Sequence, residues 1–392
     1  MTMKRRDLLK TIAATGAATL LDRPGFGFAP PPAKRLKKAE IMMDQYTWYR
    51  LPWLRRVFSD PLRGHYDSDD VATVERQNEE KNFFAVPVDC VSWWGPTHWS
   101  YELFQQGYLR ASNFSSRRFC FLYEITGRLR QSRVLNAPAE TAAEEFARGR
   151  LDGEWKRKYH FDFRDAYNRD TFLADIDFLA KHHFASDNYY RIDGRPVLYI
   201  WTDNLKFFDA TSARARKTVY LIGSEPFFYP PEPSETERFT RPNWYDAITS
   251  YGMNPVYVAK NWRSLRAEFR AAYVRMARTW VGLLKTHAPD SRLLLPVQFT
   301  YHDKNGSTDP KDGRNRILTC QKGEGEAFLQ EVKTLFEKTP RILGLHLTSY
   351  NEHYEGTSFE PSVFEAAGGL KIGYGSRWLT LVKRAFKDNV LA

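Results

Sequence analysis

The sequence has few cysteines, and they form no pattern. Three stand among 392 residues, at Cys90, Cys120 and Cys320, an odd number with wide spacing. This arrangement excludes a disulfide framework and any Cys-x-x-Cys metal site. Cys90 and Cys120 fall inside predicted strands, where we expect each buried thiol to act as a small hydrophobic side chain.

Two further classes of hydrolytic site lack their sequence signatures. The nine histidines include no His-x-His pair, and His182-His183 lies on a predicted helix without carboxylates at ligand spacing. No Gly-x-Ser-x-Gly motif is present to expose a nucleophilic serine. We therefore expect no metal site, no serine nucleophile and no cofactor.

Long apolar runs are also missing. After the N-terminal segment, no stretch approaches the roughly 20 apolar residues of a membrane helix, so we expect no membrane span in the body of the protein. The segment itself contains Arg5-Arg6, then Leu8-Leu9-Lys10 and a mildly apolar stretch, which resembles a twin-arginine export signal. We expect residues 1–38 to be this signal with a basic, proline-rich linker. The protein would then be periplasmic or extracellular, and anchored if the signal is not cleaved.

The positive charge lies mostly in that leader. The chain has a formal charge of +11, and residues 1–38 hold nine basic and two acidic residues, or +7. Only about +4 is left for residues 39–392, too little to indicate a partner as acidic as nucleic acid. We expect no nucleic-acid binding, and the composition leaves the oligomeric state open.

Eight apolar runs alternate with segments of helical period. The order predicts an α/β fold, a single-domain (β/α)8 barrel over residues 39–392, because strand and helix alternate and the length suits one barrel. The predicted strands cover 39–49, 83–94, 118–125, 196–203, 218–224, 247–253, 293–300 and 342–350. Predicted helices include 71–82, 170–183, 265–287, 324–337 and 378–387, and the charged stretch 131–168 is expected to cross the barrel mouth.

The eighth run leads directly into two carboxylates, Glu352 and Glu355. In such a barrel the C-terminal ends of the strands form the active face, so these residues are catalytic candidates. Cleavage of a glycosidic bond needs one carboxyl group that holds a proton for the leaving oxygen and one that is ionised. The aromatic content of 15% also suits sugar binding, although a large core explains it equally.

The segment from Tyr350 to Pro361 resembles the Asn-Glu-Trp-x-Glu-Gly-Thr-x-x-Glu-Pro signature of glycoside hydrolase family 99, the endo-α-mannosidases and their relatives. Segments 64–69, 91–95 and 190–199 fit the same family in order. The resemblance implies a (β/α)8 barrel and retaining endo-cleavage of α-mannosidic linkages through a 1,2-anhydro sugar. It implies that Glu352 is the base for the sugar 2-hydroxyl, that Glu355 is the acid/base, and that Glu124 contacts the substrate.

One position departs from that signature, because His353 stands where the family has tryptophan. His353 either orients Glu352 or is merely exposed. This departure also leaves the identity of the substrate open. His65 and Tyr66 either bind sugar or close a turn. The residues predicted to bind substrate are Tyr46, Trp48, His65, Tyr66, Trp93, Trp94, Glu124, Asp203, Tyr251, Asn254, Asn351 and His353.

The expected partner is therefore an oligosaccharide or polysaccharide. Two alternatives stay open: a hydrolase for another α-linked polysaccharide, and a glycan-binding or polysaccharide-biosynthesis protein on the same barrel without hydrolase activity, since fold does not settle function.

Overall fold

The computed structural model describes residues 37–53, 55–133, 159–201, 205–231, 240–253, 264–303, 316–321, 323–365 and 370–389. The predicted export signal lies outside these residues, as does most of the charged stretch 131–168. Within the described part of the chain, no helix combines the length and the apolar character needed to cross a membrane.

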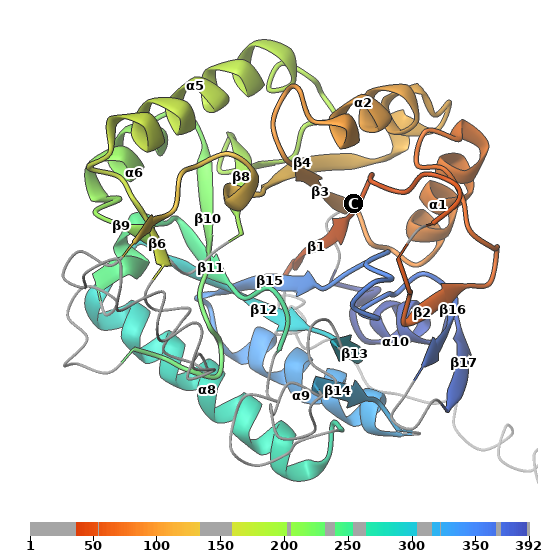
Figure 1. Ribbon diagram of the computed structural model, residues 1–392. Helices are drawn as coiled ribbons and strands as arrows, with labels where there is room; N and C mark the ends of the chain where they lie inside the picture. The colour runs from red at the N-terminus through yellow and green to blue at the C-terminus, as the bar shows by residue number, and fades with distance from the viewer. Residues whose placement is uncertain are drawn as a thin grey trace, which may run out of the picture. The chain divides into compact units, whose positions relative to one another are not determined.

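Eight parallel strands form a closed ring, as the sequence predicts (Figure 1). Neighbours follow chain order, and the ring closes because the eighth strand pairs with the first and β8 pairs with β10. The strands are β1 (Glu40–Gln45), β3 (Val88–Trp93), β4 (Arg118–Tyr123), β8 (Arg195–Ile200), β10 (Tyr220–Ser224), β11 (Ala247–Thr249), β12 (Arg292–Val297) and β15 (Ile342–Leu347). Most predicted strands extend too far at the C-terminal end, where polar residues leave the ladder for the loops.

Helices surround the ring on its outer side (Figure 1). Asp70 caps α1 by accepting a hydrogen bond from the N–H of Ala72, as its place before a helical run predicts. The helices are α1 (Val71–Phe83), α2 (Trp99–Gln106), α5 (Ala166–His182), α6 (Asp209–Ala215), α8 (Ala267–His287), α9 (Glu324–Lys338) and α10 (Arg377–Phe386). The five helices predicted from the sequence match described ones, which confirms a (β/α)8 barrel.

Short elements complete the part of the chain that the structure describes. Three short 3-10 helices and a four-residue one cover Tyr108–Arg110, Phe114–Ser116, Ile125–Gly127 and Arg241–Trp244. The short strands are β2 (Ser59–Pro61), β5 (Ser132–Arg133), β6 (Tyr159–Asp162), β7 (Arg191–Ile192), β9 (Leu205–Lys206), β13 (Thr300–Asp303), β14 (Arg316–Thr319), β16 (Ser362–Glu365) and β17 (Lys371–Gly375). Strands β17, β16 and β2 form a small antiparallel sheet, which joins residues that follow β1 to residues that follow β15.

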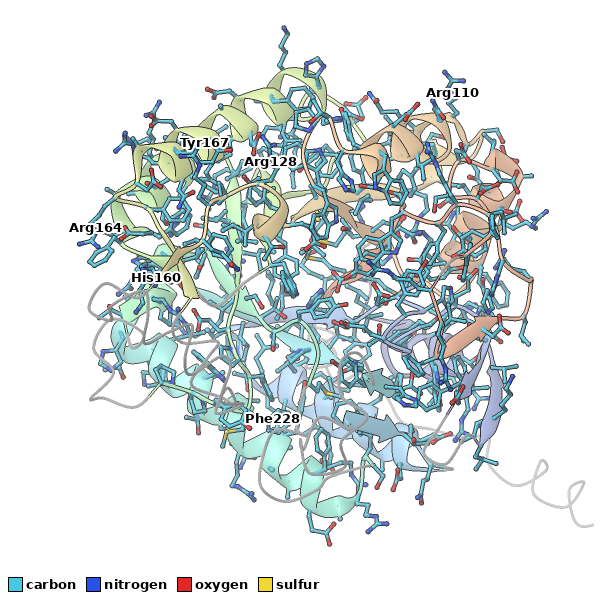
Figure 2. The ribbon with its side chains drawn as sticks, viewed as in Figure 1. Arg110, Arg128, His160, Arg164, Tyr167 and Phe228 are labelled. Atoms are coloured by element: carbon cyan, nitrogen blue, oxygen red, sulfur yellow. The ribbon has the colours of Figure 1, made fainter. Side chains whose placement is uncertain are left out.

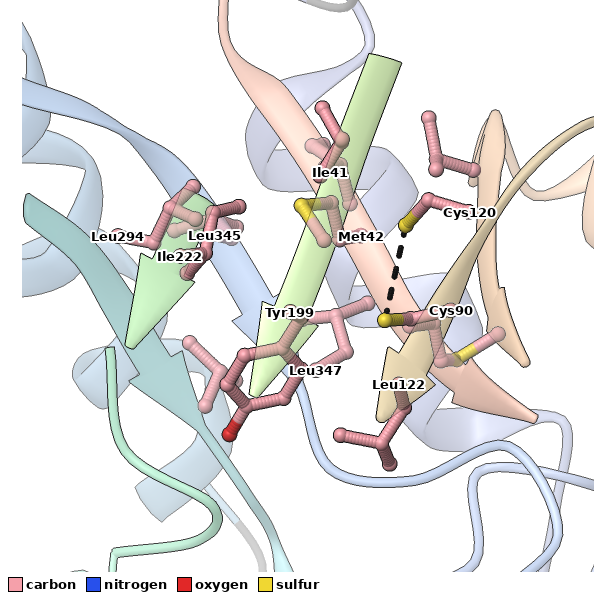
Figure 3. Packing of buried hydrophobic residues seen from close by; sticks show 14 of the residues in the cluster. Ile41, Met42, Cys90, Cys120, Leu122, Tyr199, Ile222, Leu294, Leu345 and Leu347 are labelled. Atoms are coloured by element: carbon pink, nitrogen blue, oxygen red, sulfur yellow. Dashed lines mark hydrogen bonds between the residues drawn. The ribbon is translucent and has the colours of Figure 1, made fainter. Parts of the chain in front are cut away.

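The middle of the barrel is apolar. Met42, Cys90, Cys120, Tyr199 and Ile222 come from five strands and pack together (Figure 3). The sulfurs of Cys90 and Cys120 are 3.6 Å apart, and both are free, buried thiols, so the prediction of their burial is confirmed. Filling a barrel with layers of inward side chains in this way makes it a packed core rather than a pore.

Towards the C-terminal ends of the strands the interior becomes polar. His346 on β15 lies 5.0 Å, ring centre to ring centre, from Tyr199 on β8, and its Nδ1 is 3.2 Å from the hydroxyl of Thr249 on β11. Neither strand neighbours β15, so these side chains meet inside the ring. Asp44 on β1 accepts a hydrogen bond from His346 Nε2 at 2.8 Å. This polar layer lies at the face where the predicted catalytic segment begins.

Candidate active site

The segment after β15 folds back on itself and is tied to β1. The N–H of Tyr350 donates to the carbonyl of Asp44 at 2.7 Å, and the N–H of Phe359 and Glu360 donate to the carbonyls of Ser349 and Tyr350 at 2.8 Å. Gly356 reverses the chain with a φ of +60°, and a Cβ there would meet the ring of Phe364 at 2.9 Å. The glycine of the motif is therefore required by backbone conformation and by space.

Glu352 is buried at the end of this barrel strand. Its N–H donates to the hydroxyl of Ser349 at 2.7 Å, and its carboxyl accepts the N–H of Tyr354 at 3.0 Å. Burial raises the pKa of Glu352 well above its ordinary value, and the negative charge of Glu355 raises it further. The two glutamates therefore interact, and Glu352 retains a proton at pH values where an exposed carboxyl is ionised.

Glu355 is half-buried and is reached by a pair of tyrosines. Tyr46 donates its hydroxyl to that of Tyr251 at 2.9 Å, and Tyr251 donates to the Glu355 carboxyl at 3.3 Å. The Glu355 carbonyl accepts the N–H of His302 in the β13–β14 hairpin. Burial raises the pKa of Tyr251, and the charge of Glu355 adds to this effect, so both groups share one environment.

Glu124 is a third carboxyl group in the same region. It follows β4, is buried, and accepts a hydrogen bond from Ser92 at 2.8 Å, while Ser92 accepts the indole N–H of Trp94 at 3.0 Å. Burial raises the pKa of Glu124 to about 8. The hydrogen bond from Ser92 lowers this pKa, and the negative charges of Asp44 and Glu355 raise it. Glu124 is therefore largely protonated at neutral pH and can donate a hydrogen bond to a hydroxyl.

Asn351, a predicted binding residue, fixes the chain directly after β1 beside these carboxyl groups. Asn351 accepts the N–H of Tyr46 at 2.8 Å and donates to the carbonyl of Tyr46 at 2.9 Å. Trp48 stacks on Tyr46, with ring centres 4.3 Å apart, and Trp94 lies 6.3 Å from Trp48. The structure thus brings Tyr46, Trp48, Trp94, Glu124, Tyr251 and Asn351 together with Glu352 and Glu355.

His353 lies behind the two glutamates. Its side chain is fully buried, with Nε2 2.9 Å from Glu360 and Nδ1 3.0 Å from the hydroxyl of Ser59. Burial alone would raise the pKa of Glu360, but the hydrogen bond and charge of His353, and the charge of Arg63, hold it below its usual range. The structure excludes exposure of His353, and its ring nitrogens bond Glu360 and Ser59 rather than the Glu352 carboxyl, so the ring holds the segment between the two glutamates.

The Gly64 to Asp69 loop also supports the segment from behind. Tyr66 is buried, and its hydroxyl donates to Glu360 at 2.9 Å and accepts from Asn351 at 3.2 Å. His65 stacks on Trp53, with ring centres 4.1 Å apart, and pairs with Asp60. These contacts favour a structural role for both residues over sugar binding.

The expectation that Trp93 binds substrate is corrected by its position. Its ring is 1% exposed and packs against Tyr123, Tyr101 of α2 and Phe178 of α5. Alternation along β3 directs Ser92 towards Glu124 and Trp93 towards the surrounding helices, because successive side chains of a strand point to opposite faces. Asp203 and Asn254, also predicted to bind substrate, lie outside the described residues.

Sequence reasoning missed three polar residues at this site: Asp44, Ser92 and His346. Each is a polar residue within an apolar run, two positions from another inward-facing residue. Because residues i and i+2 of a strand share a face, this spacing could have predicted that they point into the barrel. Among the residues that the structure describes, no group of three or more His, Cys, Asp or Glu side chains is placed to hold a metal ion. Carboxyl groups in such an arrangement can donate and accept protons.

Comparison with known proteins places the fold. No protein-family model and no curated protein matches the sequence. A solved structure described as a glycoside hydrolase-like protein covers 93% of this chain and 98% of its own, with a TM-score of 0.64 and 18% identity. The glycoside hydrolase family 99 endo-α-mannosidase of Bacteroides thetaiotaomicron, solved with Bis-Tris propane, covers 89% of this chain and 96% of its own, with a TM-score of 0.56 and 17% identity.

A second structure of that B. thetaiotaomicron enzyme gives a TM-score of 0.52 at 16% identity. These similarities show that the chain has the (β/α)8 fold found in endo-α-mannosidases of family 99. At such low identity they show the fold alone, so function must be argued from the site.

Proposed function

We propose that the protein is an exported, retaining, endo-acting glycoside hydrolase that cleaves α-mannosidic or related α-linked glycans with Glu352 and Glu355. The observation that carries this proposal is the position of Glu352 and Glu355 three residues apart after β15, where Tyr251 donates to Glu355 and the charge of Glu355 raises the pKa of the buried Glu352. The fold shared with endo-α-mannosidases supports the substrate class. Export rests on the resemblance of residues 3–10 to a twin-arginine signal.

In the proposed reaction Glu352 removes the proton of the sugar 2-hydroxyl, whose oxygen attacks the anomeric carbon to form a 1,2-anhydro sugar. Glu355 donates a proton to the departing glycosidic oxygen in the same step. Glu355 then takes a proton from water, which opens the anhydro ring at the anomeric carbon, and the 2-hydroxyl oxygen recovers a proton from Glu352. Two inversions give retained configuration.

The burial of Glu352 adds a requirement to this scheme. In the free protein, burial and the charge of Glu355 favour a protonated Glu352, whereas a base must be ionised. The reaction therefore needs a form in which the pair holds one proton and that proton lies on Glu355. Because the reaction needs Glu352 ionised and Glu355 protonated, activity should follow a bell-shaped pH profile.

The test is digestion of a panel of α-linked glycans by the wild type, Glu352→Gln and Glu355→Gln, with Glu75→Gln on the surface of α1 as the matched control. We expect the wild type and the control to release oligosaccharides. Loss of a placed proton-transfer group should lower kcat by about 10² to 10⁴ in each site variant. Full activity in either site variant on unactivated glycans would refute its assigned role, and binding without cleavage by the wild type would indicate a glycan-binding protein.

A further inference from the structure

A row of aromatic rings leads away from Glu355 towards the surface. It begins at Tyr46, which reaches Glu355 through Tyr251, and continues through Trp48 to Trp94. The row does not end there. The ring of His98 stacks on Trp94 at 5.6 Å between centres, and Trp99 follows at 5.4 Å from His98.

The outer end of the row is exposed but held on a fixed base. Trp99, the first residue of α2, is 39% exposed. His98 caps this helix by accepting the N–H of Ser100, and the hydroxyl of Thr47 donates to the Ser100 carbonyl at 3.1 Å. The loop after β1 and the start of α2 are thereby joined. A single exposed tryptophan is common on protein surfaces and needs no explanation. Trp99 differs because it ends a row of rings that begins beside Glu355, so its exposed surface is connected to that site.

Charged side chains lie beside Trp99. The Arg50 guanidinium is 5.6 Å from the centre of the Trp99 ring, and its nitrogen is 3.6 Å from a Glu102 carboxylate oxygen. Both charged side chains are more than half exposed, so the pair contributes little to stability. Together they offer hydrogen-bond donors and acceptors next to an apolar ring surface.

We propose that Trp99, Arg50 and Glu102 form a subsite for a sugar unit remote from the bond that is cleaved, so that the protein selects long glycan chains over short ones. The proposal rests on the proposed function of the carboxyl site. A pyranose combines an apolar C–H face with polar hydroxyl groups. The exposed ring of Trp99 suits the C–H face, and the Arg50–Glu102 pair suits the hydroxyl groups. Binding sites commonly combine aromatic surface with a few placed polar groups in this way.

The test compares Trp99→Ala with the wild type on α-linked manno-oligosaccharides and gluco-oligosaccharides from disaccharide to hexasaccharide. Tyr167→Ala is the matched control, because Tyr167 on α5 (Figure 2) is 42% exposed and also has an arginine, Arg130, at 3.8 Å from its ring centre. Its ring contacts Arg130 rather than the row. We expect the ratio of kcat/KM for long chains to that for short chains to fall about tenfold in Trp99→Ala, from the worth of one aromatic contact, and to keep its wild-type value in Tyr167→Ala.

A long-to-short ratio in Trp99→Ala equal to that of the wild type overturns the subsite while leaving the hydrolase intact. If the wild type cleaves none of these glycans, the proposed hydrolase fails, and the subsite is then decided by titration calorimetry with the hexasaccharides. Weaker binding by Trp99→Ala than by Tyr167→Ala supports the subsite, and equal affinity or no binding by any variant overturns it.

Discussion

The substitution Glu124→Gln tests the electrostatics of the site without measuring catalysis. Glu124 is buried, and its pKa rises from an ordinary value of 4.5 to about 8 on folding. Because the pKa is raised in the folded state, the stabilising effect of the protonated carboxyl is fully present below pH 4.5. It is lost as the pH rises through about 8. Glutamine keeps the shape and still accepts the hydrogen bond from Ser92, but it does not ionise.

The size of the effect follows from the two pKa values. The difference between 4.5 and about 8 corresponds to about 5 kcal/mol in the free energy of unfolding. The wild type should therefore lose up to about this amount relative to Glu124→Gln between acidic and mildly alkaline pH. The comparison isolates Glu124, because every other titrating group is common to both proteins.

The assay is urea unfolding at a series of pH values from acidic to mildly alkaline, followed by tryptophan fluorescence. Glu102→Gln, which alters an exposed carboxylate, serves as the control and should follow the wild-type profile. If the wild type and Glu124→Gln lose stability in parallel across this range, burial does not hold Glu124 protonated.

Two further substitutions test the parts that surround the carboxyl groups. His353→Phe removes the contacts to Glu360 and Ser59. It should lower the free energy of unfolding in urea by about 1–3 kcal/mol, because a buried carboxylate loses a partner. We also expect kcat to fall, and an unchanged kcat would contradict the positioning role. Trp93→Ala should cost about 3–5 kcal/mol, as expected for a large core side chain, while the folded fraction retains glycan cleavage. Loss of cleavage with the fold intact would return Trp93 to the substrate site.

The barrel could be predicted because local patterns and global topology agree. Eight buried parallel strands read as short apolar runs, and helices such as α1 and α8 show a cap or a periodic pattern. Strand ends were predicted poorly for a physical reason. The residues after β1, such as Tyr46 and Trp48, still read as strand-forming, although they leave the ladder to line the site.

The site could be predicted in part. Glu352, Glu355 and Glu124 follow strands, and strand ends of a parallel barrel converge. Which face of a strand a side chain occupies depends on the register of the strand. A shift of one residue moves every side chain to the opposite face. This is why the sequence alone places Trp93 at the site, although Ser92 occupies the inward position. Asp44 and His346 were missed because their partners come from strands distant in sequence.

The role of His353 required the structure. Its partners Ser59 and Glu360 approach from two different loops, which no spacing in the sequence reveals. In this chain the position is therefore a buried hydrogen-bonded pair between His353 and Glu360 rather than an exposed ring.

In the proposed reaction Glu352 acts as a base and Glu355 as an acid, and the anomeric carbon is inverted twice. Its most direct test is proton NMR of the first product released from an α-linked mannan oligosaccharide, recorded before mutarotation. We expect the new reducing end to appear first as the α-anomer. A β-anomer as the first product would contradict it.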